Sequence, residues 1–433
     1  MAERDDHLYD VLIVGGGPSG SACAYWLAEA GWDVVVVEKK QFPREKTCGD
    51  GLTPRAVRQL ADIGVEDAMT GAHRFYGLRS VAYGRSLDLR WPEVPGFPNY
   101  GYTITRHDLD ALVADRAAKA GAKVLQHTEA LEPLDATPPG DPGSLAGCAG
   151  AVVSSGPDSS PTELRARYVV VADGANSRFG RALGTARDRE YPQGMALRGY
   201  YRSDRHDEDL IESHLDIRDN GEVVPGYGWI FPLGDGRVNV GVGLLSTDRR
   251  WKGLNTSRLM DAFVAQAPKS WGLSPETSCG PPTGGRLPMG LGVGPRTGVN
   301  TVVVGDAGGL INPFNGEGIA YGYETGRLAA AFLGEALSGG GTESIAAYER
   351  RLDEIYGTYY RVGRAFVRLI SDPRRMQRCV GIGMHSQWFM AQLLRIMANL
   401  MRPEVSGAAE AGYRGLVGIA ATLDRLERAG ISV

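Results

Sequence analysis

Two purely apolar runs stand out in the first forty residues, VLIV at 11–14 and VVVV at 34–37. Four apolar residues in succession are typical of a strand that is buried on both faces of a parallel sheet. The residues between the runs are small where a helix would begin, which favours a helix over that stretch. The segment therefore predicts a strand–helix–strand unit.

Later apolar runs predict further strands, and two of them end in glycine and aspartate. YVVV at 168–171 leads into Asp173-Gly174, and TVVV at 301–304 leads into Gly305-Asp306, a glycine-rich loop and a helix. KVLQH at 123–127 has the same character. We expect these distant segments to form one domain that is discontinuous in sequence.

Between residues 225 and 243 the pattern changes to alternation, in PGYGWIFPLGDGRVNVGVG. Successive side chains of a strand point to opposite faces, so Tyr227, Trp229 and Phe231 are expected to share one face. Pro225 and Pro232 bracket the segment and should confine it to a sheet edge or to strand ends. Such an aromatic face either packs in a core or forms a flat wall for a long apolar substrate, and the pattern leaves both open.

From residue 345 onward the pattern is helical, and residues 361–402 carry eight arginines against one acid, Asp372. Large apolar residues such as Trp388 and Phe389 lie among them. A basic amphipathic region of this kind is able to lie on an anionic membrane surface. It is equally typical of a helical cover with a solvated basic face.

Length and composition limit the class of protein. A chain of 433 residues is large enough for more than one packed core, and its 43% apolar and 23% charged residues are ordinary for a globular protein. The net charge of −4 gives no indication of nucleic-acid binding. The start, MAERDDHLYD, lacks the pattern of a secretory signal, and no apolar run approaches the roughly 20 residues that span a bilayer. We expect a cytoplasmic protein that associates with the cytoplasmic face of the membrane.

Metal and disulfide chemistry are not expected. The five cysteines are scattered without CxxC spacing, and none of the seven histidines forms an HxxxH or HExxH pair. This usage fits a reducing compartment and predicts no metal site.

The glycines after the first strand have the spacing of a dinucleotide-binding loop. Gly15, Gly17 and Gly20 give G-x-G-x-x-G, and Glu38 ends the second strand eighteen residues later. The glycines permit a sharp turn, close approach of backbone to a pyrophosphate, and close packing of helix on strand. An acid at position 38 accepts ribose hydroxyls and disfavours a 2′-phosphate, which indicates FAD or NAD rather than NADP. The expected contacts at this end of the cofactor are Gly15, Gly17, Ser19, Gly20, Glu38 and Lys39.

The second strand ending in Gly305-Asp306 favours FAD, because a simple NAD domain has no need of it. Together with TRHDLDALV around Arg106, these segments resemble the p-hydroxybenzoate hydroxylase superfamily over nearly the whole chain. The resemblance implies a mixed α/β fold with a Rossmann-type FAD domain, an antiparallel substrate sheet and C-terminal helices. It also implies that Arg106 contacts the cofactor and that backbone near Ala130 contacts adenine. The flavin end is expected to meet Asp306, Gly316, Gly318 and Ile319.

On this basis the chain divides into three parts. The FAD-binding domain is expected to comprise residues 1–75, 101–185 and 297–345, and the substrate-binding sheet residues 76–100 and 186–296. Residues 346–433 form the expected C-terminal helical region.

The aromatic segment narrows the resemblance further. The PxYxWxFP motif of the geranylgeranyl reductase family is matched by Pro225, Tyr227, Trp229, Phe231 and Pro232. A second motif of that family, Cys-Gly, is matched by Cys48-Gly49. Within that family the chain is most similar to the actinobacterial menaquinone reductases. The resemblance implies an FAD-dependent enzyme that saturates a double bond of a polyprenyl chain, with these five residues lining the substrate site.

In that reaction a hydride from the flavin and a proton from the protein add to one alkene. The resemblance implies that Cys48, Gly49 and Gly51 lie at the flavin, and that Cys48 either donates the proton or tunes the flavin. Without the resemblance, a free cysteine is more often a small buried residue with no chemical role. Tyr227 and Trp229 are the other candidate catalytic residues.

The substrate and the electron donor are left open by the sequence. The alternatives are reduction of geranylgeranyl diphosphate or of an ether lipid, a flavin monooxygenase acting on a hydrophobic compound, and an FAD protein without catalysis. Only one G-x-G-x-x-G with its ribose acid is present, so the donor, NAD(P)H or a redox protein, must bind transiently.

Overall fold

The computed structural model describes residues 3–156, 159–219, 221–224, 226–246, 255–402 and 406–428. Its first sheet has the strand order β8-β2-β1-β11-β10-β9, with β21 also paired to β11. β1, β2, β8, β11 and β21 are mutually parallel where they pair, and β10 is antiparallel to both neighbours. The bounds are β1 Glu3–Val14, β2 Val34–Val37, β8 Lys123–Leu125, β9 Glu129–Leu134, β10 Gly150–Ser154, β11 Thr162–Val171 and β21 Thr301–Val303.

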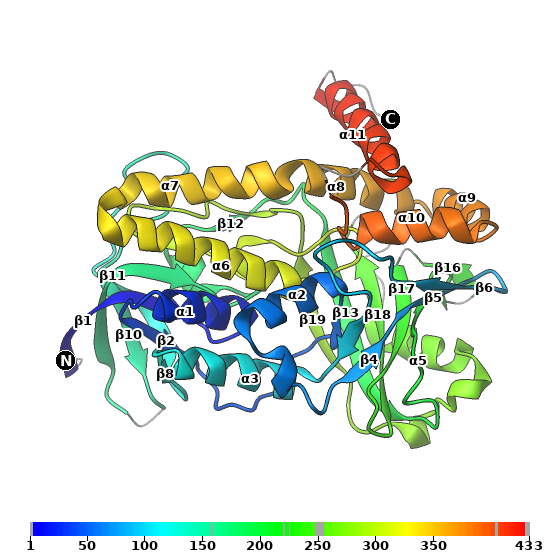
Figure 1. Ribbon diagram of the computed structural model, residues 1–433, viewed down its shortest axis with the longest axis horizontal. Helices are drawn as coiled ribbons and strands as arrows, with labels where there is room; N and C mark the ends of the chain where they lie inside the picture. The colour runs from blue at the N-terminus through cyan, green and yellow to red at the C-terminus, as the bar shows by residue number, and fades with distance from the viewer. Residues whose placement is uncertain are drawn as a thin grey trace.

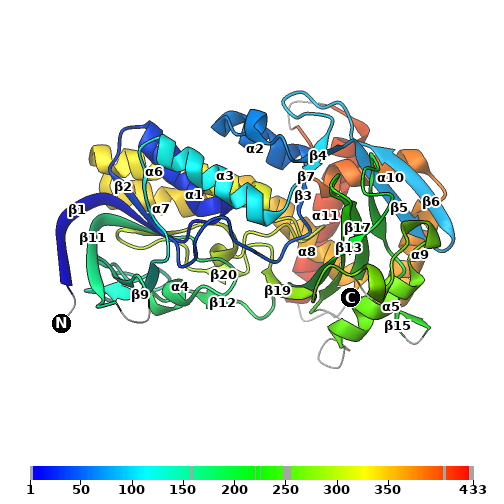
Figure 2. The ribbon, with the colours of Figure 1, turned by 90° about the horizontal axis from the view of Figure 1, so that it is seen from below.

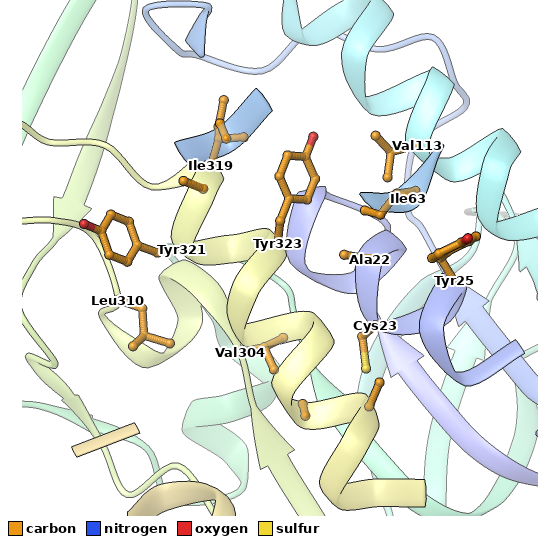
Figure 3. Close-up of a cluster of buried hydrophobic side chains, with 14 of the residues drawn as sticks. Ala22, Cys23, Tyr25, Ile63, Val113, Val304, Leu310, Ile319, Tyr321 and Tyr323 are labelled. Atoms are coloured by element: carbon orange, nitrogen blue, oxygen red, sulfur yellow. The ribbon is translucent and has the colours of Figure 1, made fainter. Parts of the chain in front are cut away.

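Helices α1 (Pro18–Glu29), α3 (Arg106–Lys119) and α6 (Ile319–Glu335) pack on this sheet (Figure 1). α1 and α6 are in close contact. A Cβ on Gly326 of α6 would be only 2.3 Å from the Ser19 carbonyl oxygen of α1, so this approach requires glycine at position 326. Figure 3 shows Ala22 and Cys23 of α1 facing α6, with Tyr323 on the side of α6 that faces Val113 of α3. The predicted strand–helix–strand unit and the return of residues 301–303 to the same sheet are confirmed.

The second sheet lies beside the first (Figure 2) and has the order β19-β13-β18-β17-β14-β5-β6. Its pairs are antiparallel except that β14 and β5 run parallel. α5 (Thr256–Gln266) covers one face, where Ile230, Val240 and Phe263 belong to one buried cluster. The bounds are β5 Gly77–Ala82, β6 Arg85–Arg90, β13 Gln193–Arg202, β14 Ile211–His214, β17 Gly226–Pro232, β18 Arg237–Leu245 and β19 Thr283–Pro288.

A small three-stranded sheet of β3 (Gly51–Leu52), β7 (Gly101–Thr103) and β4 (His73–Phe75) connects the two halves. β3 follows directly on the Cys48 loop, which we define as residues 47–51. The β3–β7 pairing and the bond from the Ile104 N–H to the Asp50 carbonyl oxygen fix the end of that loop.

The C-terminal residues form α7 (Gly341–Leu352), α8 (Thr358–Ile370), α9 (Pro373–Gly383), α10 (Gln387–Met397) and α11 (Ala408–Arg428). In Figure 1, α8 to α11 lie above the second sheet, and α10 contacts β6. The Asn312 side chain donates to the Met397 carbonyl at 2.9 Å, and Arg55 donates to the Asn399 carbonyl at 2.8 Å. In the described part of the chain, no helix has both the length and the apolar composition to cross a bilayer. The expected mixed α/β fold with an antiparallel sheet and C-terminal helices is confirmed.

Candidate active site

The loop after β1 is built so that only glycine fits at two of its positions. Gly15 has φ +106°, and a Cβ there would lie 2.4 Å from the Ala172 carbonyl oxygen. A Cβ on Gly20 would lie 1.9 Å from the Gly15 carbonyl oxygen. Gly17 differs, since its nearest neighbour would be an Arg44 nitrogen at 3.8 Å. The side of the loop at Gly17 is therefore open to a ligand.

Polar groups around this loop are available for that ligand. Gly17 caps α1 without any side-chain hydrogen bond, so the first N–H groups of the helix are free of a capping side chain. Among the described residues, the buried Arg44 Nε and Asp173 Oδ1 have no hydrogen-bond partner. Uncapped N–H groups and unpaired buried polar atoms fit a pyrophosphate and its sugars, so the site suits a dinucleotide.

Glu38 lies buried at the end of β2. One carboxylate oxygen accepts from the Gly16 N–H at 3.1 Å and from Arg44 at 3.2 Å, and the other accepts from the Lys40 N–H at 3.1 Å. The Thr128 N–H donates to the Glu38 carbonyl, which brings the start of β9, with Ala130, to the same end of the site. Lys39 is exposed.

A line of alternating charges leads from Glu38 to the Cys48 loop. Arg44 contacts Glu38 at 3.2 Å and Asp110 at 3.0 Å, and Arg106 makes two bonds to Asp110 at 2.6 and 2.7 Å. Asp110 is fully buried and Arg106 nearly so. Arg106 also lies next to Cys48, where it lowers the pKa of the thiol against the larger effect of burial. The ribose end and the Cys48 loop are thus joined by one continuous set of side chains.

Asp306 and Ser19 lie on the other side of the loop. Asp306 follows β21, and a Cβ on Gly318 would be 3.0 Å from its Oδ1 atom. Burial raises the pKa of the Asp306 carboxyl, and Lys46 and Arg106 oppose that rise. The Ser19 side chain packs against the backbone of Gly305, and the Ser19 N–H lies in the first turn of α1.

The Cys48 loop lies against the aromatic residues of β17. A Cβ on Gly49 would be 3.3 Å from the Phe231 ring and 3.5 Å from Trp229 Nε1, and a Cβ on Gly51 would be 3.0 Å from Phe231. A Cβ at either position would be in tight contact with the Phe231 ring, so the ring or the loop would have to shift by a few tenths of an ångström. The glycines on both sides of Asp50 therefore have a packing reason, which is close approach to the aromatic face.

On β17 the three aromatic side chains share one face, and each lies opposite a small or polar residue of β18. Tyr227 pairs with Gly243, Trp229 with Gly241, and Phe231 with Asn239. A Cβ on Gly241 would be 2.1 Å from the Trp229 ring. The neighbouring rings are 5.8 and 6.2 Å apart between centroids. The NVGVG segment of β18, residues 239–243, is therefore the surface against which these rings pack.

The aromatic face is also tied to the loop before α6. The Tyr227 hydroxyl donates to the Asn315 carbonyl at 2.8 Å, and a Cβ on Gly316 (φ +78°) would lie 3.5 Å from that hydroxyl. Gly318 and Ile319 follow as the N-cap and first residue of α6. The structure therefore brings the Cys48 loop, the aromatic face and the 315–319 segment together at one place.

Pro232 ends a strand that lies in the interior of the sheet. β17 lies between β18 and β14, and Pro232 is its last residue, so of the two expected placements the strand end is the one observed for Pro232. The Thr103 hydroxyl donates to the Pro232 carbonyl. Pro225 lies outside the described residues.

Burial changes the pKa of several groups at this place. It raises the pKa of the Cys48 thiol, which keeps the sulfur protonated at neutral pH. It also raises the pKa of the Asp50 carboxyl to about 6, against hydrogen bonds from Tyr200 and Asn239, and that of Tyr227 to about 12.

Several contributing residues were not expected from the sequence. Asp110 follows Arg106 by one helical turn in RHDLD, and that i,i+4 spacing could have predicted the pair. Asn239 is the one polar residue among the apolar ones of VNVGVG, a sign of a buried polar role. Arg44 and Tyr200 carry no such local sign.

Comparisons with known proteins agree on one group. The model of the FAD binding domain family matches residues 8–197. A menaquinone reductase from Mycolicibacterium smegmatis is 40% identical over 403 residues, 91% of this chain and 92% of that protein. A digeranylgeranylglycerophospholipid reductase from Methanopyrus kandleri is 30% identical over 84% of this chain and 91% of its own length. A solved geranylgeranyl bacteriochlorophyll reductase-like protein from Thermoplasma acidophilum shares the fold, with a TM-score of 0.71, 24% identity, and coverage of 99% of this chain and 100% of that one.

Proposed function

Because the chain belongs to the geranylgeranyl reductase family of FAD-dependent oxidoreductases, we propose that it saturates a carbon–carbon double bond in the polyprenyl tail of menaquinone. FAD is the cofactor. The substrate rests on the name of the M. smegmatis relative, a menaquinone reductase. The observation in the structure that carries the proposal is the packing of the Cys48 loop against the aromatic face of β17.

An isolated alkene is a poor hydride acceptor, so its reduction requires a hydride at one carbon and a proton at the other. FAD, when bound, would supply the hydride. The chain's own residues exclude water, orient the alkene and hold the proton. The Cys48 sulfur is the proposed proton holder, since burial raises the pKa of the thiol. Loss of that proton would leave a thiolate beside Arg106, whose positive charge stabilises it.

Tyr227, Trp229 and Phe231 are the proposed wall of the substrate site. Their rings give a flat apolar surface that suits a linear run of isoprene units, and their electron-rich faces favour positive charge that develops on the alkene during protonation. Pro225 and Pro232 belong to the same proposed lining through the family motif.

The electron donor is proposed to bind transiently, as NAD(P)H or as a redox protein. The chain has one G-x-G-x-x-G loop with its ribose acid, and that loop is assigned to FAD. To identify the donor class, NADH, NADPH and a reduced ferredoxin are added in turn, and reduction of the bound flavin is monitored by its absorbance.

Access to a substrate that resides in the bilayer is proposed to come from the C-terminal helices. Ile382 of α9 and Trp388 and Phe389 of α10 are 74%, 64% and 48% exposed. Arg374 and Arg375 of α9 are exposed in the same segment, where Asp372 at the N-cap of α9 is the one acid among residues 361–402. An exposed apolar group beside an excess of cations suits an anionic lipid surface.

Sedimentation with anionic vesicles tests this surface. A Trp388→Ala/Phe389→Ala variant is expected to bind at least about tenfold more weakly, because a buried aromatic side chain contributes about 1.5–3 kcal/mol. Leu131→Ala, which removes an exposed apolar residue from β9, is the control and should bind like the native chain. Binding should weaken as salt is added. Equal binding by all three proteins would reject the surface.

The reaction itself is tested by an anaerobic assay with purified protein, a chemical or enzymatic reductant and menaquinone. A reductase turns over without oxygen, whereas a monooxygenase of the same fold requires it. Turnover only in the presence of oxygen, with an oxygenated product, would overturn the proposed function.

A further inference from the structure

Asn239 of β18 is fully buried and uses both ends of its amide at the active site. Its Oδ1 atom accepts from Trp229 Nε1 at 2.9 Å. Its Nδ2 group donates to the Cys48 carbonyl oxygen at 3.0 Å and to Asp50 Oδ2 at 2.8 Å. One side chain therefore joins the aromatic face to the Cys48 loop.

The loop conformation that Asn239 holds is not one that the backbone adopts freely. Asp50 has φ +62°, in the left-handed region that non-glycine residues visit rarely. Tyr200 donates to the Asp50 carboxylate at 2.6 Å, and the Arg106 N–H donates to it at 3.2 Å. With Asn239 these donors fix the fully buried carboxylate from β13, β18 and the start of α3.

Only an amide satisfies this position. Trp229 Nε1 requires an acceptor, while the Cys48 carbonyl and the Asp50 carboxylate require donors. An aspartate would place its second carboxylate oxygen against two acceptors. An aliphatic residue would remove the partner of the Trp229 N–H and of the Cys48 carbonyl, and one of the donors to Asp50.

We propose that Asn239 is a positioning residue, which sets the separation of the Cys48 thiol from the Trp229 wall and thereby places the proposed proton donor against the bound alkene. This inference rests on the proposed function. Displacing a reacting group by about 1 Å from its productive geometry can cost about a hundredfold in rate, so this separation enters kcat directly.

The positioning role is tested without any substrate, by the rate at which each cysteine reacts with N-ethylmaleimide, resolved by peptide mass spectrometry. Asn239→Ala and Asn239→Asp are expected to raise the rate at Cys48 by about tenfold or more, since buried bonds that hold the loop are lost. Asn300 provides a matched control, because it bonds both the N–H and the carbonyl of Cys148, at 3.2 and 2.8 Å. Asn300→Ala should raise the rate at Cys148 and leave Cys48 unchanged.

The catalytic consequence is tested by steady-state kinetics with menaquinone. Asn239→Asp is expected to lower kcat about tenfold or more with a smaller change in KM. Its activity should recover partly at acid pH, where a proton can bridge Asp50 and the new carboxylate. Asp50→Asn in the same chain should also restore part of it, because the amide donor then lies on the other partner.

Folded Asn239 variants with native Cys48 labelling rates would overturn the positioning role. Faster labelling with a native kcat would overturn the catalytic consequence. If the native enzyme reduces no prenyl quinone, the proposed function and the catalytic consequence both fail, and the labelling still decides whether Asn239 holds the loop.

Discussion

The pairing of Trp229 with Gly241 gives the sharpest prediction, because a single methyl group tests it. A Cβ on Gly241 would lie 2.1 Å from the Trp229 ring, whereas carbon atoms in contact are about 3.5–4.0 Å apart. In Gly241→Ala the ring must therefore move by roughly 1.5 Å. Such a movement breaks its hydrogen bond to Asn239.

The expected cost has two parts. Overpacking of a buried site costs about 1–3 kcal/mol, and the lost hydrogen bond about 1 kcal/mol more, so the free energy of unfolding should fall by roughly 2–4 kcal/mol. Turnover should fall about tenfold or more, because the displaced ring belongs to the proposed substrate wall.

Gly243→Ala, two residues further on the same face, is the matched control. A Cβ there would lie 3.5 Å from the Tyr227 ring and 3.8 Å from Trp229, which is ordinary contact. Thermal unfolding and steady-state rates of both variants provide the assay. Equal effects of the two substitutions would refute the packing argument.

Three further predictions concern Cys48, Glu38 and Asp50. Cys48→Ser should retain bound flavin, measured by absorbance after gel filtration, and lose most of its alkene saturation; unchanged turnover would remove the thiol from the reaction. Glu38→Gln should weaken FAD binding about tenfold in a titration of the apoprotein, since a buried carboxylate at the ribose end becomes neutral; unaltered affinity would contradict its assigned role. Burial raises the pKa of Asp50 to about 6, above the usual value near 3.9, so ionisation destabilises the fold. The native chain should lose on the order of 2–3 kcal/mol relative to Asp50→Asn as the pH rises from about 4 to about 6. Relative stabilisation of the native chain over that range in thermal unfolding would show that the sign is wrong.

The sequence predicted those parts of the fold that local patterns encode. The strand–helix–strand unit followed from two apolar runs and their glycines, and the shared face of Tyr227 and Trp229 followed from period-two alternation. The interior position of β17 did not follow, because prolines at its ends are compatible with an edge strand as well. Strand order depends on pairings between distant segments that no local pattern records.

The site shows the same division. Cys48 and Gly49 were found through a family motif, yet the reason for the glycine, which is contact with Phe231 and Trp229, required the three-dimensional structure. Asn239 was missed because a single polar residue in a strand predicts burial of a polar group and does not name its partners. Two of its three partners, Cys48 and Asp50, lie nearly two hundred residues away, in the Cys48 loop.

The most direct test of the central claim is the mass of the menaquinone recovered from cells that contain or lack this protein. If the enzyme saturates one isoprene unit, quinone from the deficient cells should be lighter by two hydrogen atoms per tail. Restoring the native chain should return the saturated form, and restoring Cys48→Ser should not. Identical quinone masses in cells with and without the protein would contradict the account.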